Sequence, residues 1–298
     1  MKFRFWGVRG SIPSPGPRTA RYGGNTTCIE VCTDNGTLII LDAGTGIFAL
    51  AQQLVTRLPV QANIFITHSH WDHIHGLPFF TPLFNRGSLV RLHGAVDRAT
   101  GKGIEHVLGV QLQNSYFPVG EAQMDATIEY ETLNFGEPVA VGDAIVDNVL
   151  MNHPCTNLGY RISCNGKSLF FTGDHEPFYN LYPRDDSRHA PYQAHMEQRQ
   201  VEIEGAMRGV DALIVDCSYT LTEYPAKQGW GHGTLDSALE MAVRVGAKVL
   251  YITHHEPTRS DDDLEAVFAD LLARHQPLPA SLEVVLAYEG LEAELAGG

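Results

Sequence analysis

Four histidines and an aspartate lie within eight positions of one short segment, "ITHSHWDHIHG". The segment continues an apolar, β-branched run, so its H-x-H-x-D-H core lies at the end of a predicted strand, where open α/β sheets bind ligands. In a tight turn, His68 and His70 can face one point while Asp72 and His73 face a neighbouring one. This division suits two metal ions rather than one, and we expect His75 to be a turn residue and not a ligand.

Three more candidate ligands occur in the same setting, because His153, Asp174 and His254 each follow an apolar strand-like run. The carboxyl ends of such strands can meet at one edge of a sheet, so we expect these residues to converge with the motif. Imidazole and carboxylate ligands favour Zn²⁺, with Mn²⁺ or Fe²⁺ as alternatives. The sequence alone does not distinguish His254 from the adjacent His255 as the last ligand.

Short strand-like runs alternate with amphipathic helices along the chain. Runs such as "KFRFWGV", "TLIILDAG" and "ANIFITH" are apolar and β-branched, and Gly, Pro or Asn bounds them, as is typical of strands. Apolar residues at helical spacing mark "GIFALAQQLVTRL" as a helix. A second series of strands and helices follows in the later half. This order predicts an α/β fold of two sheets packed face to face, with helices outside.

The chain shows no internal repeat, low-complexity linker or composition break. Layered α/β folds reach 298 residues as one unit, so we expect residues 1–298 to form a single domain. The stretch at about 95–136 has weaker periodicity, and we expect it to be an insertion or a lid.

Acidic residues outnumber Lys and Arg by 35 to 21, which gives a formal net charge of −14. A field of this sign repels long polyanions, because nucleic-acid binding relies on clustered cations. A small anionic substrate stays compatible with the charge, since bound metal ions reverse the sign locally. The composition therefore favours a small substrate over long nucleic acid.

The five cysteines are irregularly spaced, which argues against a disulfide framework. The N-terminal segment reaches Gly and Pro too early for the apolar region of a signal peptide. No run approaches the roughly 18 apolar residues that identify a membrane span. We therefore expect a cytoplasmic protein that does not bind a membrane.

These residues resemble those of the metallo-β-lactamase fold superfamily of hydrolases. The H-x-H-x-D-H motif is the most specific likeness, and Asp42 in "TLIILDAGTG" matches the superfamily's buried aspartate. The resemblance extends from Gly7 to about Pro257 and implies a four-layer αββα sandwich of the metallo-β-lactamase type. It also implies which residues bind two divalent metal ions: His68, His70 and His153 the first, Asp72, His73 and His254 the second, and Asp174 both.

Three details indicate which branch of the superfamily the chain resembles. An aspartate at 174, rather than a cysteine, resembles the phosphodiesterases and glyoxalase II more than the zinc β-lactamases, and we expect Cys155 and Cys217 to be core or near-site thiols. The turn "GWGHGT" resembles that of tRNA 3′-processing nucleases and related phosphodiesterases, which implies that His232 contacts the scissile phosphate. The opening "WGVRGSIPSPG" resembles that of cyclic-nucleotide phosphodiesterases.

Three residues outside the ligand set are candidates for binding the substrate. Arg9 flanks a loop rich in Gly, Ser and Thr, whose backbone N–H groups could hold a phosphate. Tyr116 and Phe117 lie in the expected lid and could stack on a base. The substrate that these groups suit is a small anionic phosphodiester.

The expected reaction is the hydrolysis of a small phosphodiester, such as a cyclic nucleotide, at a dinuclear metal centre. A metal-bridging hydroxide would be the nucleophile, with Asp72 both binding a metal and orienting the attack. His232 would stabilise the developing charge or protonate the leaving oxygen.

Other functions use the same metal ligands. A tRNA 3′-end endonuclease is one alternative, but the Gly/Pro- and Lys-rich arm of that family is not found in the sequence. A thioester hydrolase of the glyoxalase II kind has no need for His232 in its turn, and a non-enzymatic metal-binding module would be expected to lack some of the ligands. Similar proteins often form homodimers, although no sequence pattern here identifies an interface.

Overall fold

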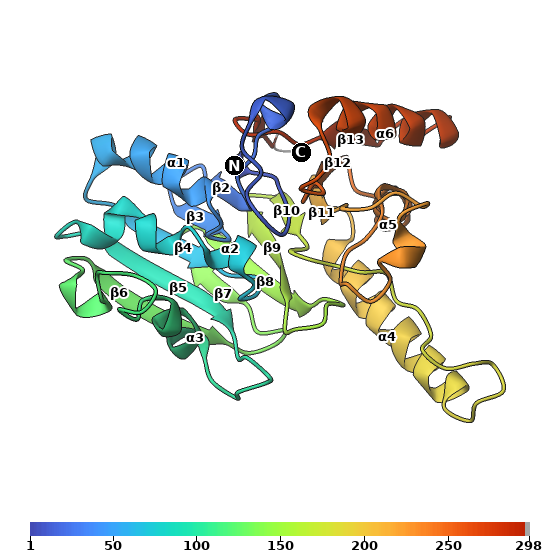
Figure 1. Ribbon diagram of the computed structural model, residues 1–298, viewed down its shortest axis with the longest axis horizontal. Helices are drawn as coiled ribbons and strands as arrows, with labels where there is room; N and C mark the ends of the chain where they lie inside the picture. The colour runs from blue at the N-terminus through green and yellow to red at the C-terminus, as the bar shows by residue number, and fades with distance from the viewer. Residues whose placement is uncertain (296–298) are drawn as a thin grey trace.

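Two mixed β-sheets pack face to face (Figure 1). The computed structural model describes residues 1–295, and within that range each sheet has seven strands. The first sheet has the order β14 (Glu292–Glu294), β1 (Lys2–Gly7), β2 (Cys28–Cys32), β3 (Leu38–Leu41), β4 (Gln61–Phe65), β5 (Leu89–Ala95) and β6 (Thr127–Leu133). The second sheet has the order β13 (Glu283–Leu286), β12 (Val249–Thr253), β11 (Ala212–Asp216), β10 (Lys167–Phe171), β9 (Leu158–Cys164), β8 (Ala144–Leu150) and β7 (Val139–Val141).

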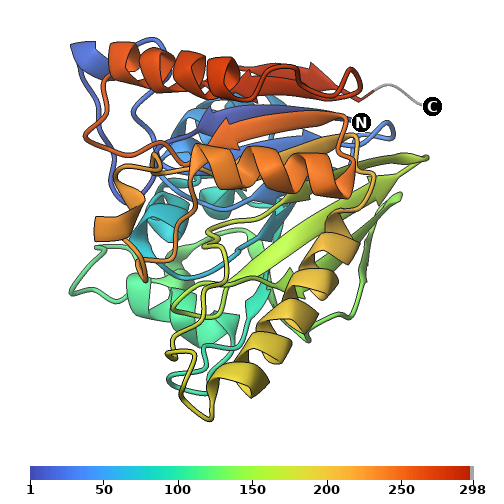
Figure 2. The same cartoon turned by 90° about the vertical axis from the view of Figure 1, so that its right-hand side faces the viewer.

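Helices cover the outer faces of both sheets. The first sheet carries α1 (Gly46–Leu54) and α3 (Ile104–Gln111). The second sheet carries α4 (His189–Met207) and α5 (Leu235–Val245), and α6 (Asp261–Arg274) packs beside α5, as the turned view in Figure 2 shows. The predicted α/β fold with the layers αββα is therefore confirmed.

Apolar side chains form one layer between the sheets and one layer under each set of helices. The strand β4 shows how the pleat divides them, because Phe65 faces the other sheet while Ile64 faces the helices. On α1, Ile47 and Leu50 are fully buried and Phe48 is exposed, as the helical spacing of the sequence predicts. Each buried side chain of this kind stabilises the fold by about 1.5–3 kcal/mol relative to an exposed one.

Strand direction decides where the polar segments after the strands meet. The strands β3, β4 and β5 are parallel to one another, and so are β10, β11 and β12. The strand β8 runs in the same direction as β10, because both are antiparallel to β9. The segments that follow these strands lie at one side of the sandwich, and His68 of the first sheet there approaches Asp174 of the second to 3.3 Å.

The segment at about 95–136 is only partly irregular. It contains α3 and a short 3₁₀ helix at Glu121–Gln123, and its last part forms β6, the outer strand of the first sheet. The part that is available for an insertion or a lid is therefore residues 96–126. Among residues 1–295, no helix combines the length and the apolar character that crossing a membrane requires.

Candidate metal centre

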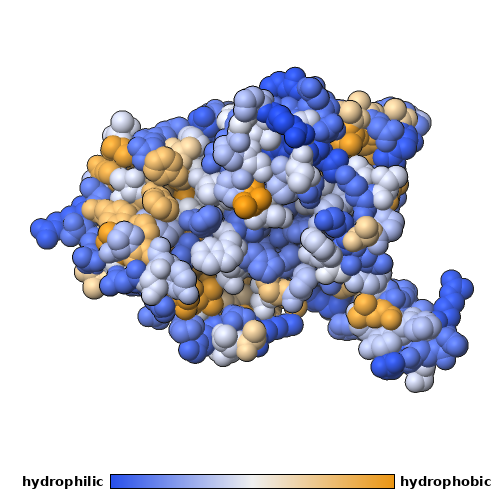
Figure 3. Space-filling model, in the orientation of Figure 1, coloured by the Kyte–Doolittle hydropathy of each residue, from blue (hydrophilic) through white to orange (hydrophobic). Residues whose placement is uncertain are grey.

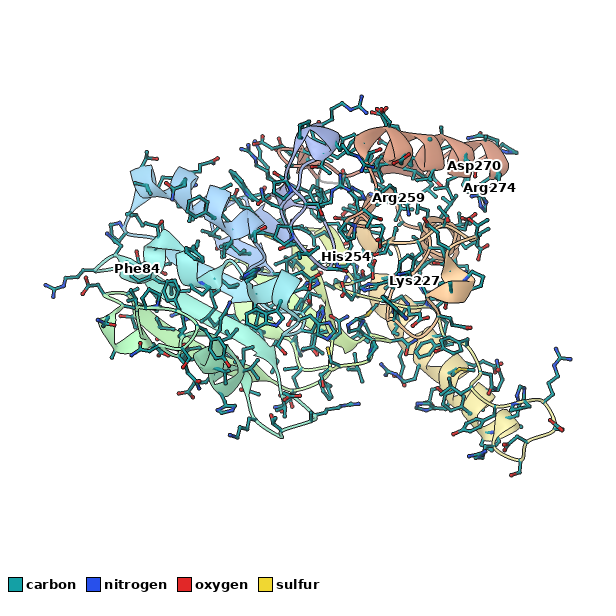
Figure 4. The ribbon with its side chains drawn as sticks, viewed as in Figure 1. Phe84, Lys227, His254, Arg259, Asp270 and Arg274 are labelled. Carbon is teal, nitrogen blue, oxygen red and sulfur yellow. The ribbon has the colours of Figure 1, made fainter. Side chains whose placement is uncertain are left out.

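The seven predicted ligands lie together at the side of the sandwich where β4, β8, β10 and β12 end. They come from the segments after these four strands, and α2 (Trp71–Ile74) carries two of them, Asp72 and His73. Figure 4 shows His254 near the middle of the face that Figure 1 presents. The fold therefore assembles one centre from residues that are up to 186 positions apart, since His68 and His254 both contact Asp174.

The first group of ligand atoms comes from three histidines, two of which approach one oxygen of Asp174. The Nε2 atom of His68 lies 3.3 Å from Asp174 Oδ2, and the Nε2 atom of His153 lies 3.8 Å from the same oxygen. The Nδ1 atom of His70 is 3.1 Å from Nε2 of His153. The three imidazoles thus lie together, and Oδ2 of Asp174 approaches two of them.

The second group surrounds the other oxygen of Asp174. The Nε2 atoms of His73 and His254 lie 3.2 Å and 3.1 Å from Asp174 Oδ1. The same two nitrogens lie 3.3 Å and 3.2 Å from Oδ2 of Asp72. Asp174 therefore faces one group with each of its oxygens, which is the arrangement of a carboxylate that bridges two metal ions.

The donor atoms of both groups fit divalent metal ions. Most of the neighbouring donor atoms are 3.1–3.3 Å apart, and a tetrahedral ion with bonds of about 2.0–2.1 Å needs ligand separations of about 3.3 Å. Within residues 1–295, three of these buried atoms have no hydrogen-bond partner, namely Nε2 of His68, Nε2 of His73 and Oδ1 of Asp174. Leaving a buried polar atom unpaired costs about 1–3 kcal/mol, so the cluster is suited to cations that these atoms can bind.

In three of the ligand imidazoles, the second nitrogen has a partner that fixes the orientation of the ring. Asp42 Oδ2 lies 2.7 Å from Nδ1 of His73, and Ser218 Oγ lies 3.0 Å from Nδ1 of His254. The Nδ1 atom of His153 donates to the carbonyl oxygen of Gly231 at 3.0 Å. Such partners hold a metal-binding histidine in one tautomer and raise its basicity.

The protonation states differ between the two groups. Burial lowers the pKa of His70 to about 4 and that of His153 to about 3, so both are neutral near pH 7, as metal binding requires. Burial also opposes the charged form of His73 and His254, but the carboxylate of Asp174, with its neighbouring acids, outweighs this effect and raises the pKa of both. The second group is thus an acid-rich environment that attracts cations.

His232 lies beside the second group, in the turn before α5. Its Nδ1 atom is 2.8 Å from Oδ2 of Asp216, and its ring stacks on that of His254 with centroids 4.9 Å apart. Burial disfavours the imidazolium form, but the charges of Asp216 and Asp174 overcome this and raise the pKa of His232. The N–H group at Nδ1 donates to Asp216, so Nε2 of His232 points away from Asp216.

Asp216 was missed at the level of sequence, although a signal was present. It is 1% exposed and ends the apolar run "ALIVD", in the same way that Asp174 ends "SLFFTGD". The neighbouring Cys217, expected to be a core or near-site thiol, is buried and donates to the carbonyl oxygen of Val215. Cys155 lies nearer the centre, with its Sγ within 4.8 Å of the donor atoms of the first group.

Glu176 is a second residue that the sequence did not indicate. Its carboxylate is buried and accepts hydrogen bonds from the backbone N–H groups of Gly229 and Gly231, at 2.7 Å and 3.0 Å. Gly231 has a φ of 91°, and a Cβ at this position would lie 2.3 Å from Nδ1 of His153. The carboxylate therefore holds the turn that carries His232, and only glycine fits where the turn meets His153.

The structure contradicts the substrate-binding role expected for Arg9. The side chain is 0% exposed, and its guanidinium donates to the carbonyl oxygens of Gly23 and Arg259 at 2.8 Å and 2.9 Å. It also forms an ion pair with Asp261 at 3.4 Å. Arg9 joins the N-terminal loop to the start of α6, and no part of its guanidinium is left for a substrate.

The two adjacent histidines at the end of β12 are separated by the fold. His254 has a φ of 57° and points into the cluster, whereas Nε2 of His255 donates to the carbonyl oxygen of Ala287 at 2.8 Å. His75 is exposed and lies edge-on to Trp71, outside both ligand groups. The geometry thus favours His254 as the ligand.

The two aromatic residues of the expected lid lie on or near the surface. Tyr116 is 64% exposed, and the ring of Phe117 packs edge-on against Phe79 with centroids 5.4 Å apart. Their expected role in stacking on a base stays a prediction.

The chain belongs to the family described as the β-lactamase superfamily domain, whose family model matches residues 37–255. Ribonuclease Z of Gemmatimonas aurantiaca is 25% identical in an alignment that covers 89% of this chain and 88% of that protein. Ribonuclease Z of Pyrobaculum aerophilum is 25% identical over 74% of this chain and 76% of that protein. Together with the family model, these relatives identify a metal-dependent hydrolase.

Solved structures share the fold at low sequence identity. The short form of human tRNase Z matches with a TM-score of 0.65 and 16% identity, over 99% of this chain and all of that chain. Zn²⁺-bound PqqB from Methylobacterium extorquens has the same TM-score and identity, over 99% of this chain and all of that chain. A diphosphatase of the PhnP family matches with a TM-score of 0.60 and 20% identity, over 99% of this chain and 98% of that chain. The resemblance inferred from the motifs is therefore confirmed.

Proposed function

We propose that this β-lactamase superfamily member hydrolyses phosphodiesters at a centre of two divalent metal ions, with zinc favoured. The observation that carries the proposal is the position of His232. The metal ligands alone suit several hydrolytic reactions, whereas His232 adds a buried proton donor, anchored by Asp216, beside the second ligand group. Such a donor suits a reaction in which a leaving oxygen acquires negative charge.

The residues of the chain have separate tasks in this proposal. His68, His70, His153 and Asp174 would hold one ion, and Asp72, His73, His254 and Asp174 the other. Two such ions, when bound, lower the pKa of water and neutralise the oxygens of a phosphodiester. Oδ2 of Asp72 also accepts the backbone N–H of Ser11 at 2.7 Å, so the N-terminal loop keeps this carboxylate in its orientation.

His232 would stabilise the negative charge that develops on the substrate or protonate the leaving oxygen through Nε2. Asp216 holds Nδ1 and favours the imidazolium form. Glu176 and the glycines of the turn fix the backbone on both sides of His232. A proton donor whose position is fixed in advance costs no reorganisation when the reaction occurs.

A small phosphodiester is the favoured substrate, and a cyclic nucleotide is one such compound. The net charge of −14 supports this choice, because long nucleic acids require a cationic surface. A second candidate substrate is the 3′ end of a precursor tRNA. The similarity to ribonuclease Z supports this candidate, because the alignments with that enzyme cover most of this chain. This relationship counts against excluding nucleic acid on charge alone.

A panel of substrates tests the proposal. Protein loaded with Zn²⁺ or Mn²⁺ is assayed with bis(p-nitrophenyl) phosphate, cyclic AMP, cyclic GMP, a precursor tRNA, a glutathione thioester and a β-lactam. We expect hydrolysis of the small phosphodiesters and no turnover of the thioester or the β-lactam. Turnover of the thioester alone would refute the proposal, and cleavage of the precursor tRNA in preference to the small diesters would favour the second candidate.

A further inference from the structure

An aromatic pocket of about 180 Å³ lies directly beside His153. Its walls include Phe178, Tyr179, Leu181 and Tyr192, which come from the segment after β10 and from the first turn of α4. Resting on the function proposed above, we propose that this pocket binds the base of a nucleotide, so that one nucleoside of the substrate lies next to the first ligand group. The substrate class would then be a nucleotide phosphodiester.

The size and lining of the pocket suit a base. Pockets for drug-sized ligands have about 300–1,000 Å³, so a volume of about 180 Å³ fits one planar ring system rather than a larger group. Aromatic side chains stack on the faces of bases with little dependence on the base sequence. Asn152 and His153 also line the pocket, and the ring of His153 belongs to the candidate metal centre, where it approaches Asp174 to 3.8 Å.

The wall of the pocket nearest to His232 is rigid. Gly229 lines the pocket, and its N–H group donates to Glu176, whose other oxygen accepts from Gly231. The hydroxyl group of Tyr179 would lie 3.2 Å from a Cβ on Gly229, so Tyr179 packs against this turn. Binding surfaces that are held in place before the ligand arrives lose little entropy on binding.

Trp230 follows Gly229, a residue of the pocket wall, directly in the chain. It stands between Gly229 and Gly231, and its side chain is 59% exposed although the backbone on both sides is held by Glu176. The ammonium group of Lys227 lies 4.0 Å from the centre of its indole ring. Figure 4 shows Lys227 on the α4 side of His254.

The pocket is open to the solvent at the base of a projecting part of the molecule. In Figure 1 the N-terminal end of α4 and the loop before it extend away from the two sheets, and Figure 3 shows this part standing out from the body. Phe178 and Tyr179 follow closely after Asp174 in the chain and precede α4. A nucleotide whose phosphate binds at the metal centre can therefore reach the pocket with its base.

Two phosphodiesters with the same leaving group test the inference. Thymidine 5′-(p-nitrophenyl phosphate) carries a nucleoside, whereas bis(p-nitrophenyl) phosphate does not. We expect the wild-type protein to prefer the first substrate, as measured by kcat/KM. In Tyr179→Ala this preference should fall about tenfold, mainly through KM, because one stacking surface is removed. Tyr179→Phe should retain the preference, since the aromatic face persists.

A binding measurement separates the pocket from catalysis. Quenching of tryptophan fluorescence is titrated with AMP and with ribose 5-phosphate, which lacks the base. We expect AMP to bind more tightly, and Tyr179→Ala to remove most of this difference. Phe48→Ala serves as the control, because Phe48 is 52% exposed on α1, at the opposite flank of the molecule.

The outcomes distinguish this inference from the proposed function. If the wild type hydrolyses both esters and neither Tyr179→Ala nor Trp230→Ala changes the preference, the pocket does not bind the base, while phosphodiester hydrolysis stands. If the metal-loaded wild type hydrolyses neither ester, the proposed function fails and this inference fails with it. A fall in preference in Phe48→Ala equal to that in Tyr179→Ala would also overturn the inference.

Discussion

The two halves of the candidate metal centre are built differently. The second half, with Asp72, His73 and His254, is at least 95% buried, and its imidazoles contact the carboxylates of Asp42 and Asp216. The first half is more open at one ligand, because His70 is exposed, whereas the side chains of His68 and His153 are 0% exposed. The partner of the His153 ring is a backbone carbonyl oxygen rather than an acid.

We therefore expect the two halves to have different roles, one in joining the sheets and the other in binding the substrate. The second half connects the two sheets, since Asp42 follows β3 of the first sheet while Asp216 and His254 belong to the second. A buried group of charges is stable only when each charge has a partner, which explains the number of acids there. The first half adjoins the aromatic pocket and the solvent, and is therefore the side at which we expect the substrate to bind.

Asp174 joins the two halves, so its loss should have the largest effect. We expect Asp174→Ala to release ions from both halves and to lower phosphodiester turnover at least about a thousandfold, because bound cations supply several kcal/mol of charge stabilisation. Elemental analysis of the dialysed protein and rates on bis(p-nitrophenyl) phosphate check this. Asp270→Ala, an exposed acid on α6 far from His254 in Figure 4, is the control. Retention of two ions by Asp174→Ala would contradict the bridging role.

Removing one histidine from each half compares their contributions to the fold. In metal-free protein, His73→Ala leaves the buried Asp42 carboxylate without its imidazole, and breaking a buried pair in this way costs about 3–5 kcal/mol. The exposed His70 has no such partner, so His70→Ala should change the free energy of unfolding by about 0.5 kcal/mol or less. Urea unfolding in the presence of a chelator measures both values. Equal losses would show that the two halves do not differ in this respect.

His232 should matter for turnover but not for metal content. We expect His232→Ala to retain both ions and to lose about a hundredfold in kcat, because it removes a positioned proton donor. Asp216→Asn should have the smaller effect of about tenfold, since the imidazole remains and only its orientation and charge are weakened. Rates are measured with metal content determined on the same samples. An unchanged rate in His232→Ala would remove its assignment to the reaction.

The smallest effect is expected from changing Asp42, which contacts the ligand His73 of the second half. Asp42→Asn keeps the shape of the side chain but weakens its contact with His73, so the affinity of this half for its ion should fall about tenfold. Titration against a competing chelator would then show one weakened ion out of two. The corresponding partner in the first half is the backbone carbonyl of Gly231, which contacts His153 and is unaffected by Asp42→Asn. The first half should therefore bind its ion with unchanged affinity in this variant.

The structure brings the predicted ligands together, and the sequence indicated this because His68, His153, Asp174 and His254 each follow an apolar strand. The alternation of strands and helices is a local pattern, and the ends of parallel strands meet wherever such strands pair. Residues whose contacts depend on distant segments were harder to predict. Arg9 precedes Asp261 by 252 positions in the chain, and nothing near Arg9 indicates that its guanidinium is enclosed by the start of α6.

The turn around His232 shows the same limit. Its glycines and its position before a helix are visible in the sequence, and these features suggested a phosphodiesterase. The carboxylate that holds the turn belongs to Glu176, which is 53 positions from Gly229, and Asp216 reaches His232 from the end of β11. Neither contact follows from spacing, because both arise only when separate strands of the second sheet lie side by side.

By itself, the sequence determined the layered α/β fold, the residue types of the candidate metal centre and the hydrolase superfamily, because these follow from local periodicity and from a dense motif. Tertiary structure alone decided which oxygen of Asp174 faces which group, that His254 and not His255 enters the cluster, and that an aromatic pocket lies beside His153. Those features depend on where strand ends and loops far apart in the chain meet in space. The packing of the two sheets determines which of these strand ends and loops come into contact, and no single segment of the sequence contains that information.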